Sequence, residues 1–165
     1  MCVVATAGDL SKLAELTTAC IARMRADGIE QWDEVYPDVA VITRDLTAGT
    51  LHVLRESDGI IGCVTLDTKH DPLWAGMVWA VAPESAAVVH RLMVHPAAQG
   101  RGLAKQLMAH AETLARARGF RAIHLDCFTA NPAALALYER LGYRRTGTAT
   151  MRKGPFVCFE KLLAP

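Results

Sequence analysis

The sequence lacks the cysteine spacing of a disulfide framework or of a zinc site. Its five cysteines are odd in number and scattered, and no C-x-x-C pair occurs among Cys2, Cys20, Cys63, Cys127 and Cys158. Disulfide scaffolds and tetrahedral zinc sites both need closely paired thiols. We therefore expect free thiols in a reducing compartment, the cytoplasm, and no metal site.

Long apolar runs and basic runs are missing as well. No window approaches the roughly 18 consecutive apolar residues of a membrane-spanning helix, and the first residues lack the positive region of a signal peptide. Aromatic residues make up only 6% of the chain, and no basic run is interleaved with them. Such a run is typical of nucleic-acid binding. We expect neither a membrane nor a nucleic acid as partner.

The chain does have the size and apolar content of one globular domain. It contains 165 residues, of which 52% are hydrophobic and 21% charged, and this predicts a single domain over residues 1–165. Charge is uneven: residues 1–85 hold 6 basic and 13 acidic side chains, and residues 86–165 hold 12 basic and 4 acidic ones. The basic half favours an anionic ligand, although chance sorting of surface charge would give the same numbers.

Hydrophobic periodicity predicts alternating helices and strands. Helices are expected over residues 10–24, 38–47, 103–118 and 132–141, each followed by a glycine at or near its end. Strands are expected over residues 3–6, 51–55, 60–66, 77–81, 86–94, 122–128 and 156–162 and from residue 143 onward, with a turn at residues 58 and 59. This order predicts a mixed α/β protein in three layers.

The segment after the 86–94 strand carries the strongest chemical signal. Gly100 and Gly102 lie where a strand ends and a helix begins. The unpaired amides and the dipole of a helix N-terminus attract anions, and glycine allows a phosphate to approach the backbone. A pyrophosphate is the natural ligand, although a turn that needs glycine only for its geometry remains an alternative. The loop is neither a P-loop nor a dinucleotide fingerprint, because Lys105 stands where the third glycine would be.

Two segments resemble the GNAT superfamily of acyl-CoA N-acyltransferases. The family signature Gln/Arg-x-x-Gly-x-Gly/Ala is matched by Gln99-Gly100-Arg101-Gly102-Leu103-Ala104. The segment from Asn131 to Tyr143 is similar to the family's Asn…Tyr-Glu-Lys-Leu-Gly-Phe, with Arg140 and Tyr143 replacing the common Lys and Phe. The resemblance implies a GNAT-type three-layer fold. Its central sheet is mixed and mostly antiparallel, with helices on both faces and a splayed parallel pair formed by the 86–94 and 122–128 strands.

The resemblance also implies an activity. A protein of this kind is expected to transfer an acyl group, most often acetyl, from acetyl-CoA to a primary amine of a small molecule or peptide by direct attack in a ternary complex. A non-catalytic acyl-CoA-binding regulatory module on the same fold is the alternative. Homodimers are frequent in the family. The sequence does not identify the acceptor amine.

Coenzyme-binding residues follow from the same match. The family uses backbone groups of the strand end and of the glycine loop, together with one asparagine; the matching residues are Leu92, Met93, Val94, Gln99, Gly100, Arg101, Gly102, Leu103, Ala104 and Asn131. The amide of Val94 is the expected donor to the oxyanion. Asn131 would also suit a plain helix N-cap.

Tyr138 and His90 are the expected catalytic residues. A tyrosine hydroxyl is protonated at neutral pH and suits the general acid that protonates the departing thiolate; a packed core aromatic is the alternative for Tyr138. His90 shares strand parity with Leu92 and Val94 if the strand is regular, and it would deprotonate the amine directly or through water. A structural histidine is an equal alternative, and Glu34 and Asp126 are weaker candidates for the base.

The acceptor site is expected in the loop after the first helix and beside the sheet. An aromatic wall with nearby acidic groups suits a cationic amine, and the candidate residues are Trp32, Glu34, Tyr36 and Trp79. Trp32 could equally plug the core beneath the loop. Cys127 is interpreted as a small buried hydrophobe rather than the nucleophile of an acyl-enzyme.

Overall fold

The structure is a computed structural model that describes residues 1–57 and 59–164; residue 58 of the expected turn lies outside them. The chain divides into two compact units: unit 1 comprises Met1–Leu66 and Arg91–His110, and unit 2 comprises Asp67–His90 and Ala111–Pro165. Strand β4 (Ala86–Val94) and helix α3 (Leu103–Ala117) therefore each contribute residues to both units. The expectation of a single domain stays a prediction.

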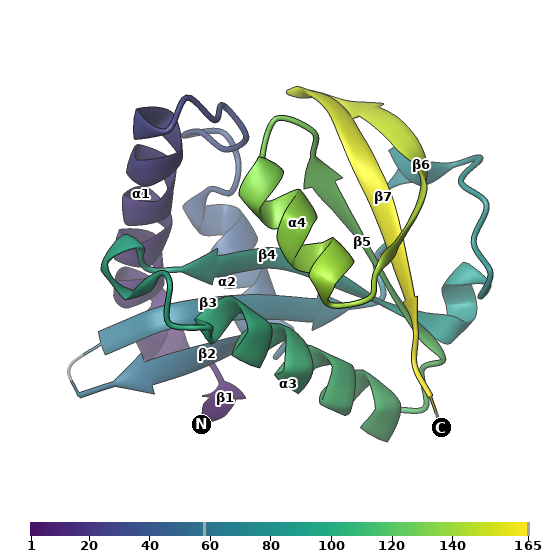
Figure 1. The fold of residues 1–165 in the computed structure, drawn as a ribbon. Coiled ribbons are helices and arrows are strands. Elements are labelled where there is room, and N and C mark those ends of the chain that lie inside the picture. The colour runs from purple at the N-terminus through teal and green to yellow at the C-terminus, as the bar shows by residue number, and fades with distance from the viewer. Residues whose placement is uncertain (58, 165) are drawn as a thin grey trace. The chain divides into compact units, whose positions relative to one another are not determined.

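Unit 1 consists of antiparallel strands and two helices. Strands β1 (Cys2–Val4), β2 (Leu51–Glu56) and β3 (Gly59–Asp67) pair in that order, and helices α1 (Leu10–Ala26) and α2 (Val39–Thr47) lie against each other (Figure 1). The apolar faces of the helices and strands share one buried cluster that includes Leu13, Leu16, Ile42, Leu51 and Val53. Burial of such side chains contributes about 1.5–3 kcal/mol each.

Unit 2 contains the only parallel strand pair that the described residues show. Its strands follow the order β4, β5 (Ala122–Phe128), β7 (Gly154–Leu162) and β6 (Arg144–Met151), and β7 is antiparallel to both neighbours. The β4–β5 ladder covers three pairs, from Ala86↔Ala122 to Val88↔His124. The next two residues of β4 in unit 2 have no partner in β5, so the pair splays after Val88, as expected.

The fold class predicted from the sequence is confirmed. Residues 1–57 and 59–164 contain seven strands in a mixed sheet and four α-helices, the last being α4 (Pro132–Arg140) (Figure 1). Every predicted helix is present, and all but one of the predicted strands. No helix in this described part of the chain has the length and apolar character needed to cross a bilayer.

The strand predicted over residues 77–81 is wrong. Residues 77–79 have no regular structure and residues 80 and 81 form a bend. The amides of Ala80 and Val81 donate instead to the carboxylate of Glu160 in β7, at 3.0 and 2.9 Å. A side-chain carboxylate thus takes the place of a neighbouring strand, and the apolar alternation of the segment gives no sign of it.

Strand β4 is also less regular than its pattern suggests. Arg91 has φ 49°, a left-handed conformation that costs a residue with a Cβ roughly 1–2 kcal/mol. A regular strand would place His90, Leu92 and Val94 on one face. The strand is not regular at Arg91, where the backbone leaves the extended region, although the burial of residues 90–94 still alternates.

Candidate active site

The glycine loop of unit 1 has the geometry expected for an anion site. Gly100 and Gly102 have φ values of 78° and 76°, and a Cβ at either position would meet no atom within 4 Å. Glycine is therefore required by the backbone conformation and not by crowding. Helix α3 starts at Leu103, and the Gln106 amide donates to the Gly102 carbonyl at 3.1 Å. The amides before Gln106 are oriented out of the helix end, and this donor set fits a pyrophosphate.

Neighbouring members of the expected coenzyme set have partners of their own. The Arg101 guanidinium forms an exposed ion pair with Glu56, which an anionic ligand could exchange. The Val94 carbonyl accepts a hydrogen bond from the Cys20 thiol at 3.5 Å, so its position in β4 is anchored to α1. Leu92 and Val94 are half-buried and Met93 is buried.

Tyr138 lies on α4 of unit 2, almost fully enclosed. Its side chain is 8% exposed and its ring contacts those of Tyr143 and Phe159. Burial, with the nearby ionisable groups of Cys127 and Asp126 adding to it, raises the pKa of Tyr138 far above its ordinary value. Its hydroxyl is therefore protonated at any physiological pH, as a general acid requires.

Asn131 and Cys127 behave as the sequence suggests. The Asn131 side chain accepts a hydrogen bond from the Ala134 amide at 3.2 Å, so its interpretation as the N-cap of α4 is confirmed, and a role toward coenzyme A stays a prediction. Burial raises the pKa of the Cys127 thiol to about 12. A thiol with that pKa is not a nucleophile at neutral pH.

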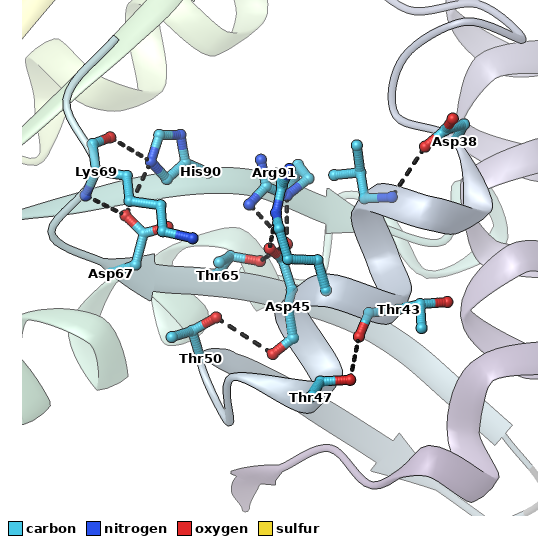
Figure 2. Close-up of polar contacts among 12 residues, drawn as sticks. Asp38, Thr43, Asp45, Thr47, Thr50, Thr65, Asp67, Lys69, His90 and Arg91 are labelled. Atoms are coloured by element: carbon cyan, nitrogen blue, oxygen red, sulfur yellow. Dashed lines mark hydrogen bonds and ion pairs between the residues drawn. The ribbon is translucent and has the colours of Figure 1, made fainter.

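His90 is held by two oxygen atoms, one from Asp67 at the end of β3 and one from Lys69 just after it. Its Nε2 atom lies 3.1 Å from Asp67 Oδ1 and 3.1 Å from the Lys69 carbonyl oxygen, and Figure 2 shows both contacts. A carboxylate and a carbonyl only accept hydrogen bonds, so Nε2 carries the proton. In the neutral ring the basic atom is then Nδ1, and the His90 side chain is 19% exposed. The arrangement orients one imidazole nitrogen for proton transfer.

Asp126, a weaker candidate for the base, interacts electrostatically with both Tyr138 and His90. Burial raises its pKa to about 6, opposed by a hydrogen bond from the Trp74 indole at 3.1 Å and by the charge of His90. A carboxyl group that titrates near neutral pH is unusual and is often found in active sites. In unit 2, Asp126 therefore interacts electrostatically with Tyr138 and, separately, with His90.

The three acceptor-site candidates of unit 1 have separate surroundings. Trp32 packs against the apolar cluster of unit 1, as the core-plug alternative proposed. The Tyr36 hydroxyl accepts a hydrogen bond from Arg91 Nη1 at 2.8 Å. Glu34 is bound by both terminal nitrogens of Arg25, at 2.7 and 2.9 Å, and this lowers its pKa to about 2. A carboxylate of that pKa is too weak a base for an ammonium group.

Trp79, the fourth candidate, belongs to a cluster that the sequence did not reveal. Its indole stacks on the His124 imidazole with ring centroids 3.9 Å apart and an angle of 13° between the planes. His124 is hydrogen-bonded to His70 and to Glu160. These partners lie 54 and 36 residues from His124, and no local motif connects them.

Comparison with known proteins places these features in a family. A sequence model of the Acetyltransferase (GNAT) family matches residues 15–143. "Acetyltransferase Atu2258" of Agrobacterium fabrum is 35% identical over 103 residues, covering 62% of this chain and 73% of that protein. "Uncharacterized N-acetyltransferase YycN" of Bacillus subtilis is 30% identical over 101 residues, covering 53% of this chain but only 65% of the relative.

Solved structures share the fold. An acetyltransferase of the GNAT family from Streptococcus agalactiae has a TM-score of 0.87 at 18% identity, and the match covers 100% of this chain and 96% of that one. A second, from Staphylococcus aureus, has a TM-score of 0.79 at 24% identity, with 99% of each chain covered. From the family match over most of its length, the chain belongs to the GNAT family of acetyltransferases.

Proposed function

We propose that the chain transfers an acetyl group from acetyl-CoA to a primary amine of a small molecule or peptide, by direct attack of the amine in a ternary complex. Membership of the family supports N-acetyltransferase activity. The observation that carries the finer proposal is the orientation of His90 by Asp67 and the Lys69 carbonyl. It leaves Nδ1 as a defined base in the unit that also holds the protonated Tyr138.

Coenzyme A would be held through its pyrophosphate by the amides of residues 100–104. The backbone of Leu92 and Val94 would bind the pantetheine arm in the manner of an added strand, and the Val94 amide would donate to the developing oxyanion. Acetyl-CoA supplies a thioester, whose carbonyl carbon is open to attack by an amine.

Tyr138 is the general acid of the proposed reaction. The departing thiolate needs a proton, and the Tyr138 hydroxyl keeps its own at neutral pH because the ring is buried. Tyr138 is better suited to this role than the Cys127 thiol, which is a poor hydrogen-bond donor and is already directed at the Phe128 carbonyl.

His90 is the general base. An alkylamine with a pKa of about 10.4 is almost wholly protonated at pH 7 and must lose a proton before it attacks. The His90 Nδ1 atom would accept that proton, directly or through water, and Asp67 would stabilise the resulting imidazolium through Nε2–H at 3.1 Å.

One experiment tests the proposal. The purified protein is incubated with acetyl-CoA and a panel of amines (polyamines, amino acids, aminoglycosides and peptides with free N-termini), and thiol release is measured beside calorimetric binding of acetyl-CoA. Turnover on at least one amine supports the enzyme. Binding without any turnover would favour the regulatory module, and absence of binding would contradict both.

A further inference from the structure

Unit 2 contains a hydrogen-bonded chain of two histidines and one carboxylate that the proposed reaction does not use. His70 Nε2 lies 2.9 Å from His124 Nδ1, and His124 Nε2 lies 2.9 Å from Glu160 Oε1. At the outer end His70 Nδ1 is 3.3 Å from the Thr68 carbonyl. His124 is fully buried, Glu160 is buried and His70 is half-buried. The chain thus runs from the interior toward solvent.

The inner end of the chain is fixed as an acceptor. The Glu160 carboxylate receives the amides of Ala80 and Val81 in addition to His124. All three groups are donors, and the carboxylate oxygens accept from them. Nε2 of His124 therefore carries a proton, and Nδ1 of the neutral ring accepts the Nε2 proton of His70.

The hydrogen-bonded chain of His70, His124 and Glu160 can take up one proton. With both imidazoles neutral, the two inner bonds are made and His70 Nδ1 is an unprotonated atom facing another acceptor, the Thr68 carbonyl. One added proton on Nδ1 completes the third bond. The Nε2 proton of His70 can then pass to His124, and the positive charge comes to rest beside Glu160. The chain takes up one proton without rearranging any side chain.

We propose that His70, His124 and Glu160 form a proton relay that accepts the proton released by acetyl transfer and returns it to solvent. This inference rests on the proposed function. The C–N bond forms and the C–S bond breaks, and the ammonium nitrogen loses two protons overall. One of them balances the proton that Tyr138 gives to sulfur. The other has to leave His90, and the relay offers it a second acceptor.

The surroundings link the relay to His90. The segment Asp67–His70 supplies both acceptors of His90 Nε2 and the outer end of the relay. Burial lowers the pKa of His70, the charge of His90 lowers it further, and the carboxylates of Asp67 and Glu84 oppose both effects. A positive charge on His90 therefore disfavours the protonated form of His70. Lys69 and Asp71 flank His70 in the sequence, and Asp126 lies on β5 beside the Trp74 indole.

Burial also favours the neutral form of both imidazoles in the resting relay. Burial lowers the pKa of His124, against the opposing effect of Glu160. Trp79 stacks on its ring, and Trp74 lies edge-on to His70 at 5.7 Å between ring centroids. These indoles exclude water from the inner links, and protons then enter and leave at His70.

The first test is an imidazole titration by NMR on the ligand-free protein, in wild type, Glu160→Gln and His110→Gln. Loss of the carboxylate removes the counter-charge of the imidazolium, so Glu160→Gln should lower the pH at which His70 and His124 titrate by about one unit or more. His110→Gln is the control, because His110 and His52 form a similar pair in unit 1 at 3.0 Å. An unchanged His70 titration in Glu160→Gln would overturn the relay.

The second test is the pH dependence of kcat in His70→Gln, a milder change at a half-buried position that keeps Glu160 and its two amide bonds. The relay predicts that the pH at which kcat reaches half its maximum moves, with KM for acetyl-CoA unchanged. A purely structural role would lower kcat by the same factor at every pH, and that result would overturn the relay's part in the reaction. Because the NMR titration needs no substrate, its failure counts against the relay alone. Absence of turnover in the wild type counts against the proposed function.

Discussion

Each unit contains a buried polar network, and the two differ in whether their charge can change. In unit 1 the Asp45 carboxylate accepts from Arg91 at 2.6 Å and from the Thr65 hydroxyl at 3.0 Å (Figure 2), and both charged side chains are 4% exposed. Arginine does not deprotonate in proteins. In unit 2 the buried network consists of two imidazoles, His70 and His124, and the Glu160 carboxylate, and an imidazole can gain or lose a proton. The fixed charges hold a backbone shape, and the groups that can change their charge are the ones we propose for proton transfer.

The unit 1 network explains how β4 tolerates its left-handed residue. Arg91 donates through Nε to Asp45 and through Nη1 to Tyr36. These bonds oppose the strain of its positive φ. They also tie Tyr36, in the loop after α1, to the strand that we propose for the pantetheine arm. Strain held in place by surrounding contacts is common at functional sites.

Loss of the Tyr138 hydroxyl, the proposed general acid in unit 2, should have the largest effect on activity. Tyr138→Phe removes only the hydroxyl and keeps the ring packing, so we expect kcat to fall by about 10²–10⁴-fold with little change in acetyl-CoA binding. Steady-state kinetics at saturating acetyl-CoA, beside calorimetry, measures both. Tyr143→Phe is the matched control, since its hydroxyl is bound to Glu112 at 3.2 Å. Equal losses in the two variants would mean that the Tyr138 hydroxyl has no specific role in the reaction.

Breaking the fixed-charge network should have the largest effect on stability. Asp45→Ala leaves the Arg91 guanidinium buried without its carboxylate, and we expect the free energy of unfolding to fall by about 3–5 kcal/mol. Denaturant unfolding at pH 6 and pH 8 should show the same loss. The double variant Asp45→Leu/Arg91→Met removes both charges and should recover much of it. A single variant within about 1 kcal/mol of wild type would show that the ion pair does not support the strand.

Between pH 4 and pH 7, the contribution of Asp126 in unit 2 to stability should change with pH, and that of the Asp45–Arg91 ion pair in unit 1 should not. Burial raises the pKa of Asp126 from 3.8 to about 6, so the folded state disfavours its ionised form. That cost is absent below pH 4, grows as pH rises toward 6 and is constant above it. Relative to wild type, the free energy of unfolding of Asp126→Asn should therefore rise by on the order of 2–3 kcal/mol between pH 4 and pH 7.

Asp9 in unit 1 has a lowered pKa, so its effect on stability changes with pH in the opposite direction to that of Asp126. A hydrogen bond from Arg55 is the main reason that the pKa of Asp9 is lowered to about 2, so its contribution to stability is present above pH 4 and lost as pH falls toward 2. Between pH 4 and pH 7 the stability of Asp9→Asn should stay parallel to wild type. If the free energy of unfolding of Asp126→Asn also stays parallel to wild type over this range, the pKa of Asp126 is not raised.

Local signals in the sequence predicted much of the fold. Asn131 before Pro132, and Gly142 after the last apolar turn, bracket α4 as capping preferences require, and β5 has the predicted bounds of residues 122–128. The expected splay of β4 from β5 was also correct. These features depend on residues close together in the chain, or on a family motif that stands as a continuous segment.

The features that sequence reasoning missed depend on distant partners. The amides of Ala80 and Val81 are taken by a carboxylate 80 and 79 residues away, so an apolar stretch that looks like a strand is not one. The left-handed Arg91 interrupts a strand whose burial pattern still alternates. The His70 relay joins a loop, β5 and β7. Tertiary contacts of this kind leave no periodicity to detect.

The smallest expected effect is a loss of acetyl-CoA affinity, which distinguishes a glycine needed for binding from one needed only for backbone conformation. Gly102 in the loop of unit 1 and Gly119 at the end of α3 in unit 2 have φ values of 76° and 81°, and neither has an atom within 4 Å of an added Cβ. Alanine at either should cost about 1–2 kcal/mol of stability through strain alone. Only Gly102→Ala should also weaken acetyl-CoA binding, by roughly tenfold or about 1.4 kcal/mol, because it disturbs amides assigned to the pyrophosphate. Calorimetry on both variants decides it: equal affinities would show that the loop's conformation serves the chain's turn and not the coenzyme.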